Sequence, residues 1–123
     1  MTQEPMSGYL TTHVLNLAQG RPAAGMRVEL WRLEDDGART WLATAVTNDD
    51  GRVDDPLLAG DDFHIGAYEL VFAVDDYFAA EGLGASPPFL TSVPVRFTIG
   101  DPDAHYHVPL LVTPWAYSTY RGS

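Results

Sequence analysis

The segment His105-Tyr106-His107-Val108-Pro109-Leu110-Leu111, near the end of the chain, predicts a β-strand with two unlike faces. Because side chains alternate along a strand, His105 and His107 point to the same side of it. The side chains at positions 106, 108 and 110, on the opposite side, are apolar and suited to a hydrophobic core. The segment therefore predicts a sheet that covers a core and carries two imidazoles on its other face.

The residues after this strand form a C-terminal tail of uncommon composition. After a turn at Thr113-Pro114, a second short strand is predicted over residues 115–120, and the chain stops at Tyr120-Arg121-Gly122-Ser123. Chain termini are commonly poorly ordered, whereas this one carries an aromatic ring, a guanidinium and a hydroxyl. We therefore expect the tail to have a function.

The rest of the chain is also rich in predicted strands, separated by turns. Alternating or β-branched segments predict strands over residues 9–17, 26–33, 40–47, 63–72 and 93–99, with room for a short one between Arg52 and a loop at 56–62. Pro94 predicts that its strand lies at a sheet edge. One short helix is predicted over residues 77–81, capped by Asp75 or Asp76 and ended by a glycine. Seven or eight strands at spacings of about 8–12 residues predict an all-β sandwich.

Length and composition restrict what the chain can do. Its 123 residues are enough for a single domain, 1–123, in which residues 1–8 are expected to be a flexible N-terminus. The chain has no cysteine and its seven basic residues are all arginine, so thiolate metal sites, thiol nucleophiles and lysine Schiff bases are excluded. A net charge of -10 disfavours nucleic acids and anionic membrane surfaces as partners.

The N-terminus gives no sign of export. It lacks the basic region and apolar run of a signal peptide, and no apolar stretch approaches the roughly 20 residues that span a membrane. We therefore expect a cytoplasmic protein.

The histidines are the main candidates for chemistry, although a histidine in a strand is most often structural. His64 precedes a strand and is expected to be a surface or structural residue. Two functional alternatives use the others. The pair His105 and His107, with His13, could ligate zinc. Alternatively, His107 and His13 could transfer protons near neutral pH, with Arg52 orienting an electron-rich substrate. A serine nucleophile is not supported, because the G-x-S-x-G motif is absent.

Several motifs together resemble the 5-hydroxyisourate hydrolases, the enzymatic relatives of transthyretin. The terminal Tyr120-Arg121-Gly122-Ser123 is the most specific of them, because transthyretin itself lacks it. The matching segments run from about residue 9 to the end of the chain: 10–15, 20–23, 47–52, 63–72, 105–111 and 117–123.

This resemblance implies a fold, an assembly and a reaction. The implied fold is a transthyretin-like β-sandwich of seven to eight strands with one short helix, assembled as a homotetramer with active sites in a channel between subunits. The implied reaction is hydrolysis of 5-hydroxyisourate, the unstable product of urate oxidation, to 2-oxo-4-hydroxy-4-carboxy-5-ureidoimidazoline. No cofactor and no metal is implied, and a functional coupling to urate oxidase is a natural expectation.

The resemblance also implies roles for individual residues. The catalytic residues of the family correspond to His13, Arg52, His107 and Ser123. The implied substrate-binding residues are Tyr120, Arg121 and His105. How the two catalytic histidines divide acid and base roles stays open, as does whether the terminal serine acts through its hydroxyl or its carboxylate.

Two other classes of function compete with the hydrolase. One is a transthyretin-like module that binds a small ligand without catalysis. A carrier does not need the full set of His13, Arg52, His107 and the terminal tetrapeptide, which favours the enzyme. The other is a structural adhesion sandwich, which usually comes with an export signal or tandem copies.

Overall fold

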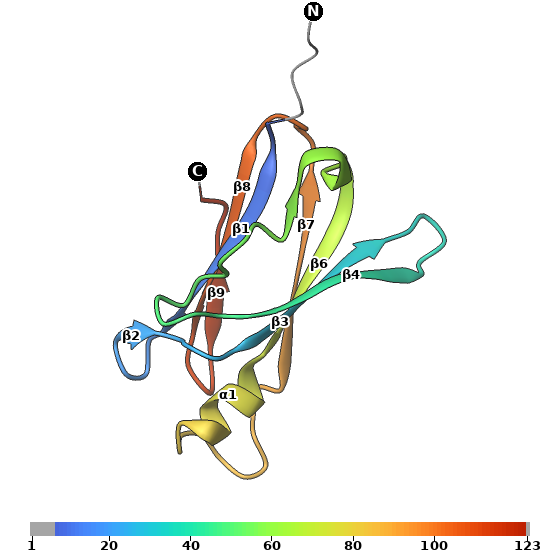
Figure 1. Cartoon of the computed structure of the whole chain (residues 1–123). Coiled ribbons are helices and arrows are strands. Elements are labelled where there is room, and N and C mark those ends of the chain that lie inside the picture. The colour runs from blue at the N-terminus through green and yellow to red at the C-terminus, as the bar shows by residue number, and fades with distance from the viewer. Residues whose placement is uncertain (1–6, 123) are drawn as a thin grey trace, which may run out of the picture.

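The chain folds into two facing β-sheets (Figure 1), which confirms the predicted all-β sandwich. The computed structural model describes residues 7–122. The first sheet has the order β2-β1-β8-β9, and β5 pairs with the start of β1; its strands are β1 Tyr9–Asn16, β2 Arg21–Pro22, β5 Leu58–Ala59, β8 His105–Val112 and β9 Tyr117–Thr119. The second sheet has the order β4-β3-β6-β7; its strands are β3 Arg27–Leu33, β4 Arg39–Val46, β6 Gly66–Ala73 and β7 Ser92–Ile99.

The hydrophobic core lies between the two sheets and is built from alternating side chains of the strands. In β1 the side chains at positions 10, 12, 14 and 16 are buried, whereas those between them are more exposed. In β8 the side chains at positions 106, 108, 110 and 112 are buried in the same way. His105 and His107 are only half-buried, on the outward face of the first sheet, as the alternation predicts.

The predicted helix is present, but its predicted start is wrong. α1 spans Val74–Ala80 and begins directly where β6 ends, so that Ala73 takes the N-cap position with no side-chain hydrogen bond. Asp75 and Asp76 therefore lie inside the first turn and do not cap it. The glycine that follows, Gly82, has a φ of 72° and ends the helix as predicted.

Short elements replace two of the predicted loops and turns. The loop predicted over 56–62 contains β5 and a 3-10 turn, Gly60–Asp62, because residues 58 and 59 pair with the start of β1. The turn predicted around Arg21 contributes β2 instead. Pro94 does lie on an edge strand, β7. Within residues 7–122, no helix has the length and apolar character needed to cross a membrane.

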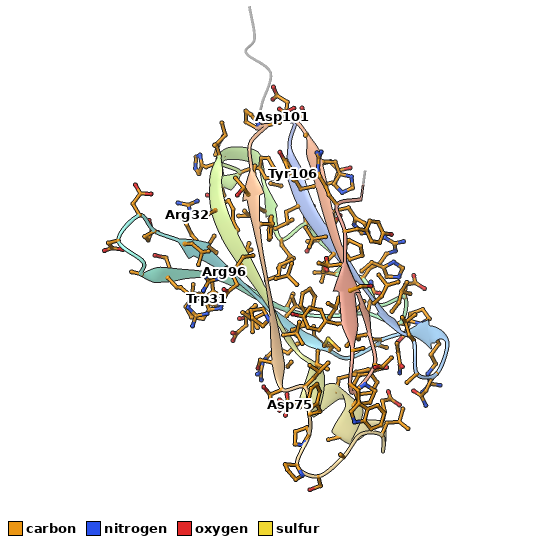
Figure 2. The ribbon with its side chains drawn as sticks, turned by 180° about the vertical axis from the view of Figure 1, so that it is seen from behind. Trp31, Arg32, Asp75, Arg96, Asp101 and Tyr106 are labelled. Carbon is orange, nitrogen blue, oxygen red and sulfur yellow. The ribbon has the colours of Figure 1, made fainter. Side chains whose placement is uncertain are left out.

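The outward face of the second sheet carries a buried carboxylate held between cations. The Glu69 carboxylate is 4% exposed and accepts hydrogen bonds from Arg39 at 2.8 Å and from Arg96 at 2.7 Å. The Arg39 guanidinium also stacks over the Trp31 ring, 4.4 Å from its centre. Figure 2 shows Trp31 and Arg96 on this side of the sandwich, away from the histidine strand. These contacts tie β3, β4, β6 and β7 together.

Candidate active site

A parallel pairing between β1 and β8 brings the first part of the site together (Figure 1). In this register Tyr9 lies beside His105, and Thr11 lies beside His107. The Thr11 hydroxyl oxygen is 2.7 Å from Nε2 of His105 and 2.8 Å from Nδ1 of His107. The Tyr9 ring stacks on His105 with 4.1 Å between ring centres and 11° between planes. Two residues of β1 therefore fix the orientation of both imidazoles.

The C-terminal tail returns along β8 and packs against one of these histidines. After β9, the Gly122 amide donates a hydrogen bond of 2.7 Å to the His107 carbonyl, and the two residues form an isolated β-bridge. A Cβ atom on Gly122 would lie 2.8 Å from Cδ2 of the His107 ring. Only glycine fits here, and the tail at this residue packs tightly against His107.

The turn before Arg52 brings this arginine to the first sheet. Gly51 has a φ of 75°, and a Cβ atom there would collide with the Val14 carbonyl. Its own carbonyl accepts a hydrogen bond of 2.8 Å from the Val14 amide. The Asn48 side-chain oxygen accepts a hydrogen bond of 3.1 Å from the Arg52 amide and so holds the turn closed. As a result Arg52 forms an isolated β-bridge with His13, in place of the short strand that was predicted between Arg52 and the loop at 56–62.

These elements border one open cleft on the outward face of the first sheet. The cleft has a volume of about 500 Å³ and is lined by Tyr9, Thr11, Thr12, Arg52, Val53, His105 and His107. The His13 ring lies 6.4 Å from the His107 ring, centre to centre. Three of the four predicted catalytic residues, His13, Arg52 and His107, are thus gathered at one place, together with His105.

Burial and a neighbouring positive charge lower the pKa of both His13 and His107. Burial lowers the pKa of His107, and the positive charge of Arg52 lowers it further, with smaller contributions from His105 and His13. Burial and Arg52 also lower the pKa of His13, partly offset by a hydrogen bond to the Asp50 backbone and by the Asp50 charge. The lowered pKa favours the neutral imidazole, whose free lone pair can accept a proton.

Arg52 itself is exposed and is the positive charge of the cleft. It forms no salt bridge with any carboxylate of residues 7–122, although Asp50 and Asp54 are close in sequence. Its guanidinium therefore keeps its donors for an electron-rich group that enters the cleft.

One ring nitrogen of each histidine in the cleft contacts the same threonine. Nε2 of His105 and Nδ1 of His107 both turn towards the Thr11 hydroxyl. Among the described residues, no group of three or more His, Cys, Asp or Glu side chains is arranged to hold a metal ion.

The remaining predicted site residues lie elsewhere or outside the described part. Ser123 lies outside the described residues, directly after Gly122. The Arg121 guanidinium stacks over the Tyr106 ring at 4.4 Å, and Tyr120 is 61% exposed. Both line a separate hollow of about 250 Å³ beside β7. In the single chain, their side chains are not in the cleft with His107.

Sequence reasoning missed two residues that shape the site, Thr11 and Tyr9. Both lie in a predicted strand, and the alternation already puts them on the same face as His13. What the sequence does not contain is the parallel register that sets Thr11 between His105 and His107. The only signal in the sequence was that Tyr9 and Thr11 are two residues apart, as His105 and His107 are.

Comparisons with known proteins show which family the sequence resembles. The profile described as "HIUase/Transthyretin family" matches residues 10–122. A 5-hydroxyisourate hydrolase of Deinococcus radiodurans is 57% identical over 120 residues, which cover 96% of this chain and 100% of the relative.

Two solved structures extend these comparisons to the fold. The structure of Klebsiella pneumoniae 5-hydroxyisourate hydrolase superposes with a TM-score of 0.79 at 35% identity, covering 94% of this chain and 99% of that one. An (S)-allantoin synthase superposes with a TM-score of 0.89 at 46% identity. This match covers 98% of the chain but spans only 46% of the synthase.

Proposed function

The chain belongs to the HIUase/Transthyretin family, and from this premise we propose that it hydrolyses 5-hydroxyisourate to 2-oxo-4-hydroxy-4-carboxy-5-ureidoimidazoline. The observation that carries the proposal is that Arg52 and His107 line one cleft, while His13 forms a β-bridge with Arg52 and its ring lies 6.4 Å from that of His107. The hydrolase predicted from the sequence is confirmed at the level of the family's close relatives, which are 5-hydroxyisourate hydrolases.

The reaction makes three demands that these side chains can meet. A water molecule must lose a proton as it attacks the acyl carbon of the ring, the oxygen of that carbon must carry developing negative charge, and the leaving ring nitrogen must gain a proton. His107, helped by His13, takes the proton from water and returns one to the leaving nitrogen. Arg52 holds the substrate oxygens and stabilises their charge.

His107 is the stronger candidate for the base. Its Nδ1 is held by Thr11, and its Nε2 has no hydrogen-bond partner among residues 7–122. His13 lies beside it, with 6.4 Å between the two ring centres, and is assigned a role in orienting the water or the substrate. Ser123, through its hydroxyl or its terminal carboxylate, positions substrate or water beside His107. No metal and no cofactor takes part in this scheme.

The chain acts as one domain, and we propose that four copies form the working enzyme. Support comes from large apolar side chains exposed on or near the edge of the first sheet: Leu17 at 52%, Trp115 at 58%, Tyr117 at 45% and Tyr120 at 61%. A monomer rarely exposes so many in one region. In a tetramer with active sites between subunits, Tyr120 and Arg121 of one copy bind substrate in the cleft of another, next to His105.

The chemistry of the substrate suggests where the enzyme works. 5-Hydroxyisourate is unstable, so its hydrolase is most useful where it is formed. We propose a cytoplasmic enzyme coupled in function to urate oxidase.

The test is the ultraviolet absorbance of 5-hydroxyisourate generated in place by urate oxidase. Addition of the protein should speed the decay well beyond the spontaneous rate. General acid–base catalysis is worth about 10²–10⁴-fold, so His107→Asn should lose most of this acceleration while it keeps the wild-type circular dichroism spectrum. Unchanged decay with a folded wild-type protein would favour a non-catalytic transthyretin-like carrier instead.

A further inference from the structure

The Thr11 hydroxyl lies between two imidazoles of the cleft, and its contact with His105 has no part in the mechanism above. It lies 2.7 Å from Nε2 of His105 and 2.8 Å from Nδ1 of His107. Both distances are short for hydrogen bonds to nitrogen, so both contacts are made. The three groups form a continuous chain from the cleft-facing His107 to His105.

The geometry of these three hydrogen-bonded groups is tightly constrained. Thr11 is β-branched and sits in the middle of β1, where the pairing with β8 fixes its backbone beside His107. The stacked Tyr9 ring holds the plane of His105 on the other side. The hydroxyl therefore cannot leave one imidazole without a change in the sheet or in the threonine rotamer.

The single hydrogen of the Thr11 hydroxyl limits which ring nitrogens can be protonated. A hydroxyl has one hydrogen to donate and two lone pairs that accept. It can donate to only one of the two ring nitrogens, so the other nitrogen must carry a hydrogen and donate to the oxygen. If His105 donates, Nδ1 of His107 accepts, and a neutral His107 then carries its proton on Nε2. If His107 donates from Nδ1, His105 accepts and Nε2 of His107 has a free lone pair.

We propose that Thr11 is a positioning residue that couples the tautomers of His105 and His107, holding His107 with Nδ1 protonated and Nε2 free to accept a proton. This inference rests on the proposed hydrolysis for its purpose, but not for its geometry. It also assigns to His105 a part different from direct substrate binding: it is the acceptor at the far end of the chain.

The same three hydrogen-bonded groups can move a proton without any other reactant. After Nε2 of His107 has taken a proton from water, the Nδ1–H bond of His107 breaks and an O–H bond to Thr11 forms. The original O–H bond of Thr11 breaks at the same time, and an N–H bond forms at Nε2 of His105. The net result is one proton transferred from His107 to His105, with Thr11 unchanged. The reverse transfer returns the proton from His105 through Thr11 to Nδ1 of His107, so that an imidazolium gives its Nε2 proton to the leaving nitrogen of the substrate and ends as the neutral Nδ1–H form.

The kinetic test compares two variants of Thr11, and one control variant of Thr44, in the 5-hydroxyisourate assay. Thr11→Val keeps the shape and the β-propensity of the residue but removes the hydroxyl, whereas Thr11→Ser keeps the hydroxyl. Loss of the group that fixes a histidine tautomer costs about 10- to 100-fold in metal sites, so we expect a loss of kcat in this range for Thr11→Val. KM should stay nearly unchanged, and Thr11→Ser should recover most of the activity.

Thr44→Val is the matched control, because Thr44 is an exposed strand threonine of the other sheet that bonds only the Trp41 ring nitrogen. It should behave as wild type. Full activity of Thr11→Val would overturn the proposal, as would a Thr11→Ser variant that is as slow as Thr11→Val.

A second measurement tests the tautomers without any catalysis. ¹⁵N NMR of the imidazoles, at a pH where both histidines are neutral, should show Nδ1 of His107 protonated and Nε2 of His105 unprotonated in the wild type. In Thr11→Val, His107 should change to the Nε2–H form that a free imidazole prefers. A wild-type His107 protonated on Nε2, or spectra of His107 that do not differ between the two proteins, would overturn the coupling. If the wild type proved inactive, the proposed function would fail while this measurement still decided the role of Thr11.

Discussion

Replacing Gly122 by alanine should damage the active site without unfolding the chain. A Cβ atom at this position would lie 2.8 Å from Cδ2 and 3.2 Å from Cβ of His107. Distances under 3.0 Å are essentially never seen for a Cβ atom, so something must move. The residue follows the last strand and is near the chain end, so the tail can move away from the sheet at little cost to the core.

The expected loss of activity follows from the distance between the added Cβ atom and the His107 ring. Restoring an ordinary contact requires the tail and the imidazole to separate by about 0.6 Å, and a misplacement near 1 Å can cost about 10²-fold in rate. We therefore expect kcat/KM for 5-hydroxyisourate to fall about 10-fold or more. The melting temperature should stay close to that of the wild type.

Gly100→Ala is the matched control for this prediction. Gly100 is exposed, and a Cβ atom there would have nothing within 4 Å. This variant should keep wild-type kcat/KM. A Gly122→Ala enzyme as active as Gly100→Ala would refute the claim that close packing of the tail on His107 sets the site.

Three further predictions concern charge. Burial and Arg52 lower the pKa of His13 and of His107 below the ordinary histidine value of 6.5, and catalysis needs the neutral form. The midpoint of the acid limb of kcat/KM should therefore lie below pH 6.5, and a midpoint above 6.5 would contradict this account. Arg52→Gln removes a charge that opposes protonation, so besides a large loss of kcat/KM it should move the acid limb of the pH profile to higher pH; an unmoved limb would count against the electrostatic coupling. Glu69→Gln removes the buried negative charge between Arg39 and Arg96. The loss should lower the free energy of unfolding by about 1–2 kcal/mol, a small value because both arginines are partly exposed, and the melting temperature by about 3–8 °C, with turnover unchanged. An unaltered melting temperature would show that these ion pairs contribute nothing to stability.

Much of the fold could be predicted because the relevant signals are local. The alternation along β1 and β8 gives both the buried face and the face that carries His105 and His107. The edge position of Pro94 follows from its missing amide hydrogen. Gly51 marks a turn because its backbone takes a φ that other residues avoid.

What the sequence could not supply depends on contacts between distant segments. The parallel pairing of β1 with β8 joins strands about 95 residues apart, and no turn motif specifies such a pairing. Thr11 becomes part of the site only through this register. The start of α1 was mispredicted for a related reason, since burial of Val74 against the core decided it rather than a capping side chain.

The site residues also fall into two groups, those that motifs identify and those whose role depends on contacts outside the motif. His13, Arg52 and His107 could be named from motifs that the family resemblance supplies, and the fold does bring them together. The roles of Tyr120, Arg121 and Ser123 remain predictions. They depend on the arrangement of subunits and on the last residue of the chain.

The central claim is that the cleft around His13, Arg52 and His107 turns over 5-hydroxyisourate rather than merely binding it. The most direct measurement is a complete progress curve with the substrate in large molar excess over the protein, followed by ultraviolet absorbance against a protein-free control. An enzyme should consume many equivalents per chain at an accelerated rate that rises in proportion to protein concentration. A carrier would alter the signal by at most one equivalent per site and leave the remaining decay at the spontaneous rate, which would contradict the account.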